Sequence, residues 1–173
     1  MIDEKELILK AKKDIQEFEG LYKIYHAKIL MFCYQRIHDK DTASDICSQT
    51  FLKAMRNIKK YEHKGVSFGS WLYRIAFNQI QDYYKKNKKV LKVSEEFLYQ
   101  LATETKEEPN ELIPKLKKAI ATLKPDLIRL IEMRFWEERP FKEIAEIMEI
   151  SEVNAKTKTY RGLEKLKQIL IKL

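Results

Sequence analysis

The 173-residue sequence has few residues that interrupt helices, since it contains only four glycines and four prolines. A fold of many short strands needs frequent turns, and turns are where glycine and proline concentrate. Hydrophobic residues instead recur at helical spacing along much of the chain. Charged residues make up 35% and hydrophobic residues 45%, a balance typical of a folded chain. The composition therefore predicts an all-α protein.

Cysteine and histidine are also scarce. Cys33 and Cys47 lie in apolar helical settings with no partner at metal-ligand spacing, and the three histidines form no H-x-x-H pair. We therefore expect no metal site and no cofactor, and we interpret both cysteines as ordinary helix residues. The sequence offers no Ser-His arrangement and no phosphate-binding loop, so it does not indicate an enzyme.

Long apolar runs are missing as well. No stretch approaches the roughly 18 residues of a membrane span, and residues 1–13 lack the apolar core of a signal peptide. We therefore expect a cytoplasmic protein without membrane insertion. The formal net charge of +8 favours a polyanionic partner, although basic surfaces also occur on proteins that bind no nucleic acid.

The densest group of aromatic residues lies in a helix predicted for residues 68–89. Six aromatic rings are distributed around this helix, and lysines follow them. One core needs fewer rings, and rings beside cations suit unstacked bases on a phosphate backbone. The pattern therefore indicates a nucleic-acid surface, preceded by a loop at residues 63–67.

Three amphipathic helices are predicted before that loop, at residues 3–17, 18–37 and 42–61. Asp3 is a possible cap of the first helix, and residues 38–41 separate the second from the third. Outside its core stripe, the third helix carries a mixed set of side chains: Asp45, Gln49, Leu52 and Arg56. This set is either a solvated face or a docking surface for a partner helix, and the pattern alone does not decide.

The composition changes beyond residue 92. Residues 94–111 contain six glutamates against one lysine, which predicts an acidic linker. The helical pattern resumes after Pro114 and is interrupted once more at Lys124-Pro125. We therefore expect a second helical domain after the linker.

The C-terminal part has the pattern of a helix-turn-helix. A short helix opens at Pro140, a tight turn follows at residues 149–151, and a longer helix begins at Ser151. The outward face of the longer helix carries side chains that reach base edges and phosphates in a major groove: Asn154, Lys156, Thr157, Lys158 and Arg161. The alternative is a plain helical hairpin whose basic face is solvated.

Three segments together resemble the bacterial sigma-70-type initiation factors, specifically the compact extracytoplasmic-function (ECF) group. Residues 68–78 resemble the promoter-melting segment of that family, and they read F-x-S-W-L-Y-R-I-A-x-N. Residues 43–54 resemble its polymerase-binding helix, with the pattern A-x-D-I-x-x-x-T-F-L-K-A. The C-terminal F-K-E-I-A-E-I-M-x-I-S…K-T-K…R-G-L-E-K-L resembles its −35-reading helix-turn-helix. The segments follow one another in the family's order and spacing.

The resemblance implies two helical domains joined by an acidic linker. Residues 1–92 would form the sigma region 2 bundle, residues 93–111 the linker, and residues 112–173 the sigma region 4 helix-turn-helix. The implied partners are core RNA polymerase, promoter DNA as a duplex −35 element and a melted −10 element, and an anti-sigma factor. It also implies a protein that is monomeric when free and that has no catalysis of its own.

The resemblance also assigns roles to particular residues. In the family, the helix at 42–61 binds a coiled coil of the largest polymerase subunit, which implies polymerase contacts for Asp45, Gln49, Leu52 and Arg56. The pocket for a flipped −10 base lies between the loop and the middle of the aromatic helix, which implies Lys64, Gly65, Val66, Ser67 and Asn78. Flanking phosphates would contact Lys85, Lys86 and Lys88. Glu149 departs from the pattern, because glycine is common at this position of the turn.

Two other functions remain open at this point. A stand-alone helix-turn-helix repressor or activator would explain the C-terminal motif, although such proteins usually dimerise and no dedicated dimerisation element is visible. A helical interaction protein with merely solvated basic faces would explain the charge.

Overall fold

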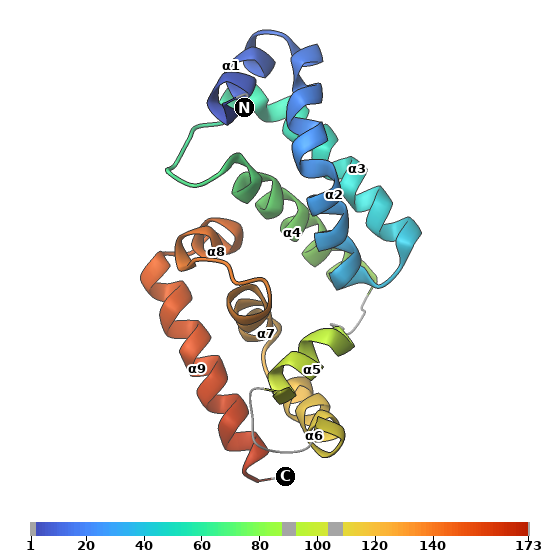
Figure 1. Ribbon diagram of the computed structural model, residues 1–173, viewed down its shortest axis with the longest axis vertical. Helices are drawn as coiled ribbons and strands as arrows, with labels where there is room; N and C mark the ends of the chain where they lie inside the picture. Colours follow the sequence, from blue (N-terminus) through green and yellow to red (C-terminus); the bar gives the residue numbers. More distant parts are fainter. Residues whose placement is uncertain (1–2, 88–92, 104–108, 173) are drawn as a thin grey trace. The chain divides into compact units, whose positions relative to one another are not determined.

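The computed structural model describes residues 3–87, 93–103 and 109–172, and all regular structure within those ranges is helical (Figure 1). The predicted all-α fold is therefore confirmed. The chain divides into two compact units, Met1–Lys92 and Val93–Leu173. The domain and linker limits proposed from the sequence stay a prediction.

The first unit is built from three long helices and a shorter N-terminal one (Figure 1). In chain order its elements are α1 (Glu4–Lys13), the short turn η1 (Ile15–Glu17), α2 (Phe18–Ile37), α3 (Lys40–Asn57), the turn η2 (Ile58–Lys60) and α4 (Phe68–Asn87). Helices α2, α3 and α4 pack against one another, whereas α1 packs on α2 and η2. The core lies between the three long helices.

Short aspartate side chains set the helix limits in this unit. The carboxylate of Asp3 accepts from the backbone N–H of Lys5 at 3.3 Å, and that of Asp39 accepts from Thr42 at 2.9 Å. The prediction of one helix over residues 3–17 is wrong beyond Lys13. Asp14 leaves the helix with extended backbone, and its side chain caps the separate turn η1.

The aromatic residues of α4 face the core more than the sequence suggested. Four of the six rings are buried, and only Tyr73 and Tyr83 are half-exposed. Because α4 packs against both α2 and α3, it needs apolar residues on more than one side. The interpretation of a surplus of aromatic surface is therefore wrong for the four rings of Phe68, Trp71, Phe77 and Tyr84.

The second unit contains five helices and one π-helical turn in its described residues. They are α5 (Glu95–Thr103), α6 (Pro109–Thr122), α7 (Pro125–Ile131), the turn η3 (Glu132–Trp136), α8 (Phe141–Met148) and α9 (Glu152–Leu170). Helix α5 lies within the acidic segment, buries Phe97, Leu98 and Ala102, and packs on α6 and η3. Helix α6 begins before Pro114, so the expectation that the helix resumes only after this proline is wrong.

The predicted helix-turn-helix geometry is confirmed at α8 and α9. Glu149 ends α8 in the left-handed conformation (φ 54°), which explains why glycine suits this position. The hydroxyl of Ser151 then caps α9 by accepting from the N–H of Asn154 at 3.2 Å. A Cβ atom on Gly162 would lie 3.1 Å from Cδ1 of Ile131, so the glycine lets α7 approach α9 closely.

No helix in the described ranges has both the length and the apolar character needed to cross a membrane. Among the same residues, no group of three or more His, Cys, Asp or Glu side chains is arranged to hold a metal ion.

Candidate nucleic-acid interface

A surface hollow of about 390 Å³ lies between the end of α3, η2 and the middle of α4. Two of its lining side chains are lysines, one is an arginine, two are asparagines, and the remaining two are apolar: Lys53, Lys60, Arg74, Asn57, Asn78, Trp71 and Ile75. The cations attract a phosphate, and an amide group carries the donors and the acceptor that suit a base edge. The amide of Asn57 already donates to the backbone carbonyl of Lys53 at 2.9 Å. The hollow therefore presents cationic and amide groups of the kind that contact a nucleotide.

Asn78 is the predicted site residue that lines this hollow, and its side chain is exposed. The sequence reasoning missed Lys53, Lys60 and Arg74. Helical spacing could have found part of the set, because Arg74 and Asn78 lie four residues apart on one face of α4. The lysines come from α3 and η2, and no periodicity predicts which helices meet.

The loop before α4 forms a separate part of the predicted −10 surface. Lys64, Gly65 and Ser67 are exposed and Val66 is half-buried, and Gly65 adopts φ 71°, which glycine permits without a steric cost. Asn78 lies ten residues into α4, about 15 Å along the helix axis. None of the four loop residues lines the hollow that contains Asn78.

Polar contacts at the start and middle of α4 orient the helix within the unit. The hydroxyl of Ser67 accepts from the N–H of Ser70 at 3.3 Å and so caps α4. Gln79 turns inward and donates to Oγ1 of Thr50 on α3 at 2.8 Å. Because Gln79 joins α3 to α4, the exposed face of α4 keeps a fixed direction relative to α3.

Lys85 and Lys86 are exposed in the last turn of α4. Lys88, the third lysine predicted to contact phosphates, lies outside the described residues.

The predicted polymerase contacts lie on one face of α3. Asp45, Gln49, Leu52 and Arg56 are all exposed, and they recur at intervals of three and four residues. Leu52 is 48% exposed, with a carboxylate and a guanidinium further along the same face. An exposed leucine between charges suits a helical partner with an apolar seam.

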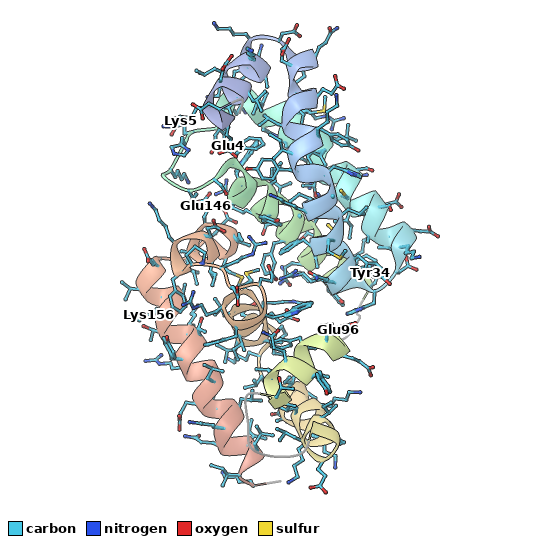
Figure 2. The ribbon with its side chains drawn as sticks, in the orientation of Figure 1. Glu4, Lys5, Tyr34, Glu96, Glu146 and Lys156 are labelled. Carbon is cyan, nitrogen blue, oxygen red and sulfur yellow. The ribbon has the colours of Figure 1, made fainter. Side chains whose placement is uncertain are left out.

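The predicted −35 face of α9 is separate from the core face of that helix. Asn154, Lys156, Thr157 and Arg161 are exposed, and Lys158 is half-buried. Figure 2 labels Lys156 on the outer side of α9. The buried residues of the opposite face are three small residues and one leucine: Ala155, Thr159, Gly162 and Leu166.

Neither cysteine is placed for nucleophilic chemistry. Cys33 and Cys47 are buried, and burial raises the pKa of the Cys33 thiol to about 12 and that of the Cys47 thiol to about 11. Both thiols are therefore protonated at neutral pH.

Comparison with known proteins identifies the class. The family model for Sigma-70 region 2 matches residues 21–90, and the model for Sigma-70, region 4 matches residues 114–166. The first match spans α2 to α4 and the second includes the helix-turn-helix. The chain belongs to the sigma-70 family of RNA polymerase sigma factors.

Individual relatives indicate the type of sigma factor within this family. The chain is 30% identical to the ECF RNA polymerase sigma factor BldN of Streptomyces coelicolor over 172 aligned residues. The alignment covers 95% of this chain and 65% of BldN. It is 28% identical over 154 residues to the ECF RNA polymerase sigma factor SigM of Bacillus subtilis, covering 87% of this chain and 93% of SigM. Within the sigma-70 family, the chain is of the extracytoplasmic-function type.

Solved structures share the fold. CnrH, solved in complex with the cytosolic domain of CnrY, matches with a TM-score of 0.61 and 16% identity, over 96% of each chain. The sigma factor RpoE of Bartonella quintana, solved in complex with the anti-sigma factor NepR, matches with a TM-score of 0.59 and 18% identity, over 90% of this chain and 97% of RpoE.

Proposed function

We propose that this chain is a dissociable promoter-specificity subunit. It binds core RNA polymerase, directs it to promoters through their −10 and −35 elements, and helps to melt the −10 region. One observation carries this proposal: both sigma-70 regions are matched in order, and the residues predicted to contact partners on α3, on α9 and at the loop before α4 are exposed, apart from the half-buried Val66 and Lys158.

Each of the three surfaces would bind a different partner. The exposed face of α3, with Leu52 near its centre, binds the polymerase. The outer face of α9 enters the major groove of the −35 duplex, where Asn154 reaches base edges and Arg161 reaches phosphates. The loop before α4 and the cationic hollow bind the melted −10 strand, with Asn78 contacting the edge of an unstacked base.

The lysines at the end of α4 add affinity without sequence preference, because phosphate contacts carry no sequence information. The protein performs no chemistry of its own and acts in the cytoplasm. It is monomeric when free, and an anti-sigma factor restrains it, as the complex of RpoE with NepR exemplifies for a protein of the same fold.

The test is co-purification with core RNA polymerase, followed by transcription from a promoter library. Polymerase binding and a shared pair of promoter elements among the transcripts would support the proposal, and failure to bind core would refute it. Leu52→Ala should weaken core binding. Leu9→Ala is a matched control, because Leu9 is also an exposed leucine on a helix of the same unit, with 59% of its surface exposed against 48% for Leu52.

A stand-alone helix-turn-helix regulator is the alternative. The region 2 match over residues 21–90 counts against it, because such a regulator does not need a polymerase-binding bundle. Tight binding to a duplex operator in the absence of polymerase would favour this alternative.

A further inference from the structure

Helix α1 holds both ends of the loop that precedes α4. At the start of the loop, Nζ of Lys12 donates to the backbone carbonyl of Tyr61 at 2.6 Å. At its end, Oε2 of Glu4 accepts from the backbone N–H of Phe68 at 3.2 Å, so that Glu4 lies between α1 and the first turn of α4 (Figure 2). Both contacts come from one helix, and they bracket residues 62–67.

Helix α1 packs on α2 and η2, so its position does not depend on the two loop contacts alone. Its core residues Leu7, Ile8 and Ala11 are buried. Leu7 packs so closely on Gly20 that a Cβ atom there would lie 2.8 Å from Cδ2 of Leu7. The position of α1 is therefore set by the core of the first unit.

Glu4 makes a second contact that anchors it. Its Oε1 accepts a short hydrogen bond from the hydroxyl of the buried Tyr25 on α2. Burial, together with this hydrogen bond, raises the pKa of Tyr25 above its ordinary value, so the phenol stays a donor. The ring of Tyr25 packs on α4, because a Cβ atom on Gly69 would lie 2.5 Å from its Cε1. One carboxylate thus joins α1, α2 and the first turn of α4.

The contacts of Glu4 and Lys12 provide a partner for the N-terminus of α4 and fix the distance between the two ends of the loop. The first N–H groups of a helix have no partner inside the helix, and a carboxylate there is favoured by the helix dipole. Eight residues separate Glu4 from Lys12, which is a rigid spacing of about 12 Å along α1. A six-residue loop can span up to about 20 Å, so chain length alone does not fix the distance between its ends.

We propose that α1 positions the −10 recognition loop, and that Glu4 and Lys12 are positioning residues for promoter melting. This inference rests on the proposed function of the loop residues 64–67. By fixing both loop ends before DNA binds, α1 lowers the ordering cost that the loop would otherwise incur on binding. Both residues lie outside residues 21–90, the part of the chain that the region 2 family model matches.

The test compares two variants with two matched controls on the same helix. The variants are Glu4→Ala and Lys12→Ala. The controls are Glu6→Ala and Lys10→Ala, whose side chains form an exposed ion pair at 2.8 Å. Each full-length protein is bound to core RNA polymerase. Affinity is then measured for a fluorescent single-stranded oligonucleotide that carries the −10 sequence selected in the promoter library.

The variants should lose about tenfold in affinity for this oligonucleotide, close to the lower limit expected when one charge-assisted hydrogen bond is lost. Affinity for core polymerase and for the −35 duplex should not change. Amide hydrogen exchange of residues 61–70 in the free protein should accelerate in the variants and not in the controls. Lys12→Arg retains a cationic donor and should restore most of the affinity.

Three outcomes would overturn the inference: unchanged exchange of residues 61–70 in both variants, unchanged −10 affinity, or an equal loss of core binding that marks a general structural defect. A wild-type protein without any preference for the −10 oligonucleotide would instead overturn the proposed function. The exchange measurement uses the free protein, so it separates these two failures.

Discussion

The second unit contains a buried ion pair between Arg129 and Glu132, and its stability contribution can be measured directly. Nη1 of Arg129 donates to Oε2 of Glu132, and the two side chains are 0% and 1% exposed. Nε and Nη2 of Arg129 have no hydrogen-bond partner among the described residues. The guanidinium therefore depends on this one carboxylate for compensation of its charge, and Glu132→Gln removes that compensation.

The expected loss follows from desolvation. Removing one member of a buried ion pair costs about 3–5 kcal/mol, because the other charge stays buried without a counter-charge. The glutamine carbonyl can still accept a hydrogen bond from Arg129, so we expect the lower end, about 3 kcal/mol. A domain of this size has a free energy of unfolding of about 5–15 kcal/mol, so the loss is a large fraction of it. Replacing both residues, Arg129→Met with Glu132→Leu, should be close to neutral.

Urea unfolding followed by Trp136 fluorescence measures this loss. Trp136 lies in η3 with its ring centroid 6.0 Å from that of Phe97, and Trp71→Phe removes the only other tryptophan of the chain. The midpoint should fall by about 2 M. Glu95→Gln is the matched control, because Glu95 pairs with Lys117 on the surface at 3.0 Å, and its loss should stay below about 1 kcal/mol.

A loss below about 1 kcal/mol in Glu132→Gln would refute this reasoning. So would a double variant that is less stable than Glu132→Gln alone. Either result would mean that the charge of Arg129 is compensated by something other than Glu132.

Three further predictions concern DNA binding and the thiols. Lys158→Ala with Arg161→Ala should weaken binding to the −35 duplex and lower its salt slope by about 1–2; an unchanged slope would remove both residues from the phosphate contacts. Asn78→Ala should reduce −10 use in transcription assays while core binding stays intact, and an equal loss of both would indicate misfolding. Cys33 and Cys47 should resist iodoacetamide until the protein unfolds. Because burial raises their folded pKa to about 12 and about 11, above the unfolded value near 8.5, their contribution to stability is present below about pH 8.5 and lost as pH rises towards 12. Unfolding free energies that stay constant from pH 8 to pH 11 would contradict this.

Local signals made several helix limits predictable. Helix α2 spans Phe18–Ile37, the range that its apolar spacing predicts, and Ser151 caps α9 at the predicted start of that helix. The prediction that the third helix begins at residue 42 is wrong, because Asp39 caps α3 and the helix begins at Lys40. Helix α5 was harder to recognise, because the wider segment of residues 94–111 contains six glutamates, whereas Phe97 and Leu98 form a buried face within the helix. Net charge obscured an amphipathic pattern there.

The candidate site was only partly predictable for a different reason. Helical periodicity placed the predicted contact residues of α3 and α9 on outward faces, because a period of 3.6 residues applies within one helix. The hollow at Asn78 combines side chains from α3, η2 and α4, and the contact between Glu4 and Phe68 joins residues 64 positions apart. Such pairings depend on how helices pack, which a local pattern does not contain.

The two faces of α9 have a consequence for how promoter preference can evolve. The inner face is buried through Ala155, Thr159, Gly162 and Leu166, and a larger side chain at Gly162 would push α7 and α9 apart. Apart from the half-buried Lys158, the residues of the outer face are exposed, and exposed substitutions usually change stability by less than about 0.5 kcal/mol. Mutations on the outer face can therefore accumulate under selection for new target sequences. Paralogues that descend from one such gene could divide a genome's promoters among themselves while keeping the same scaffold.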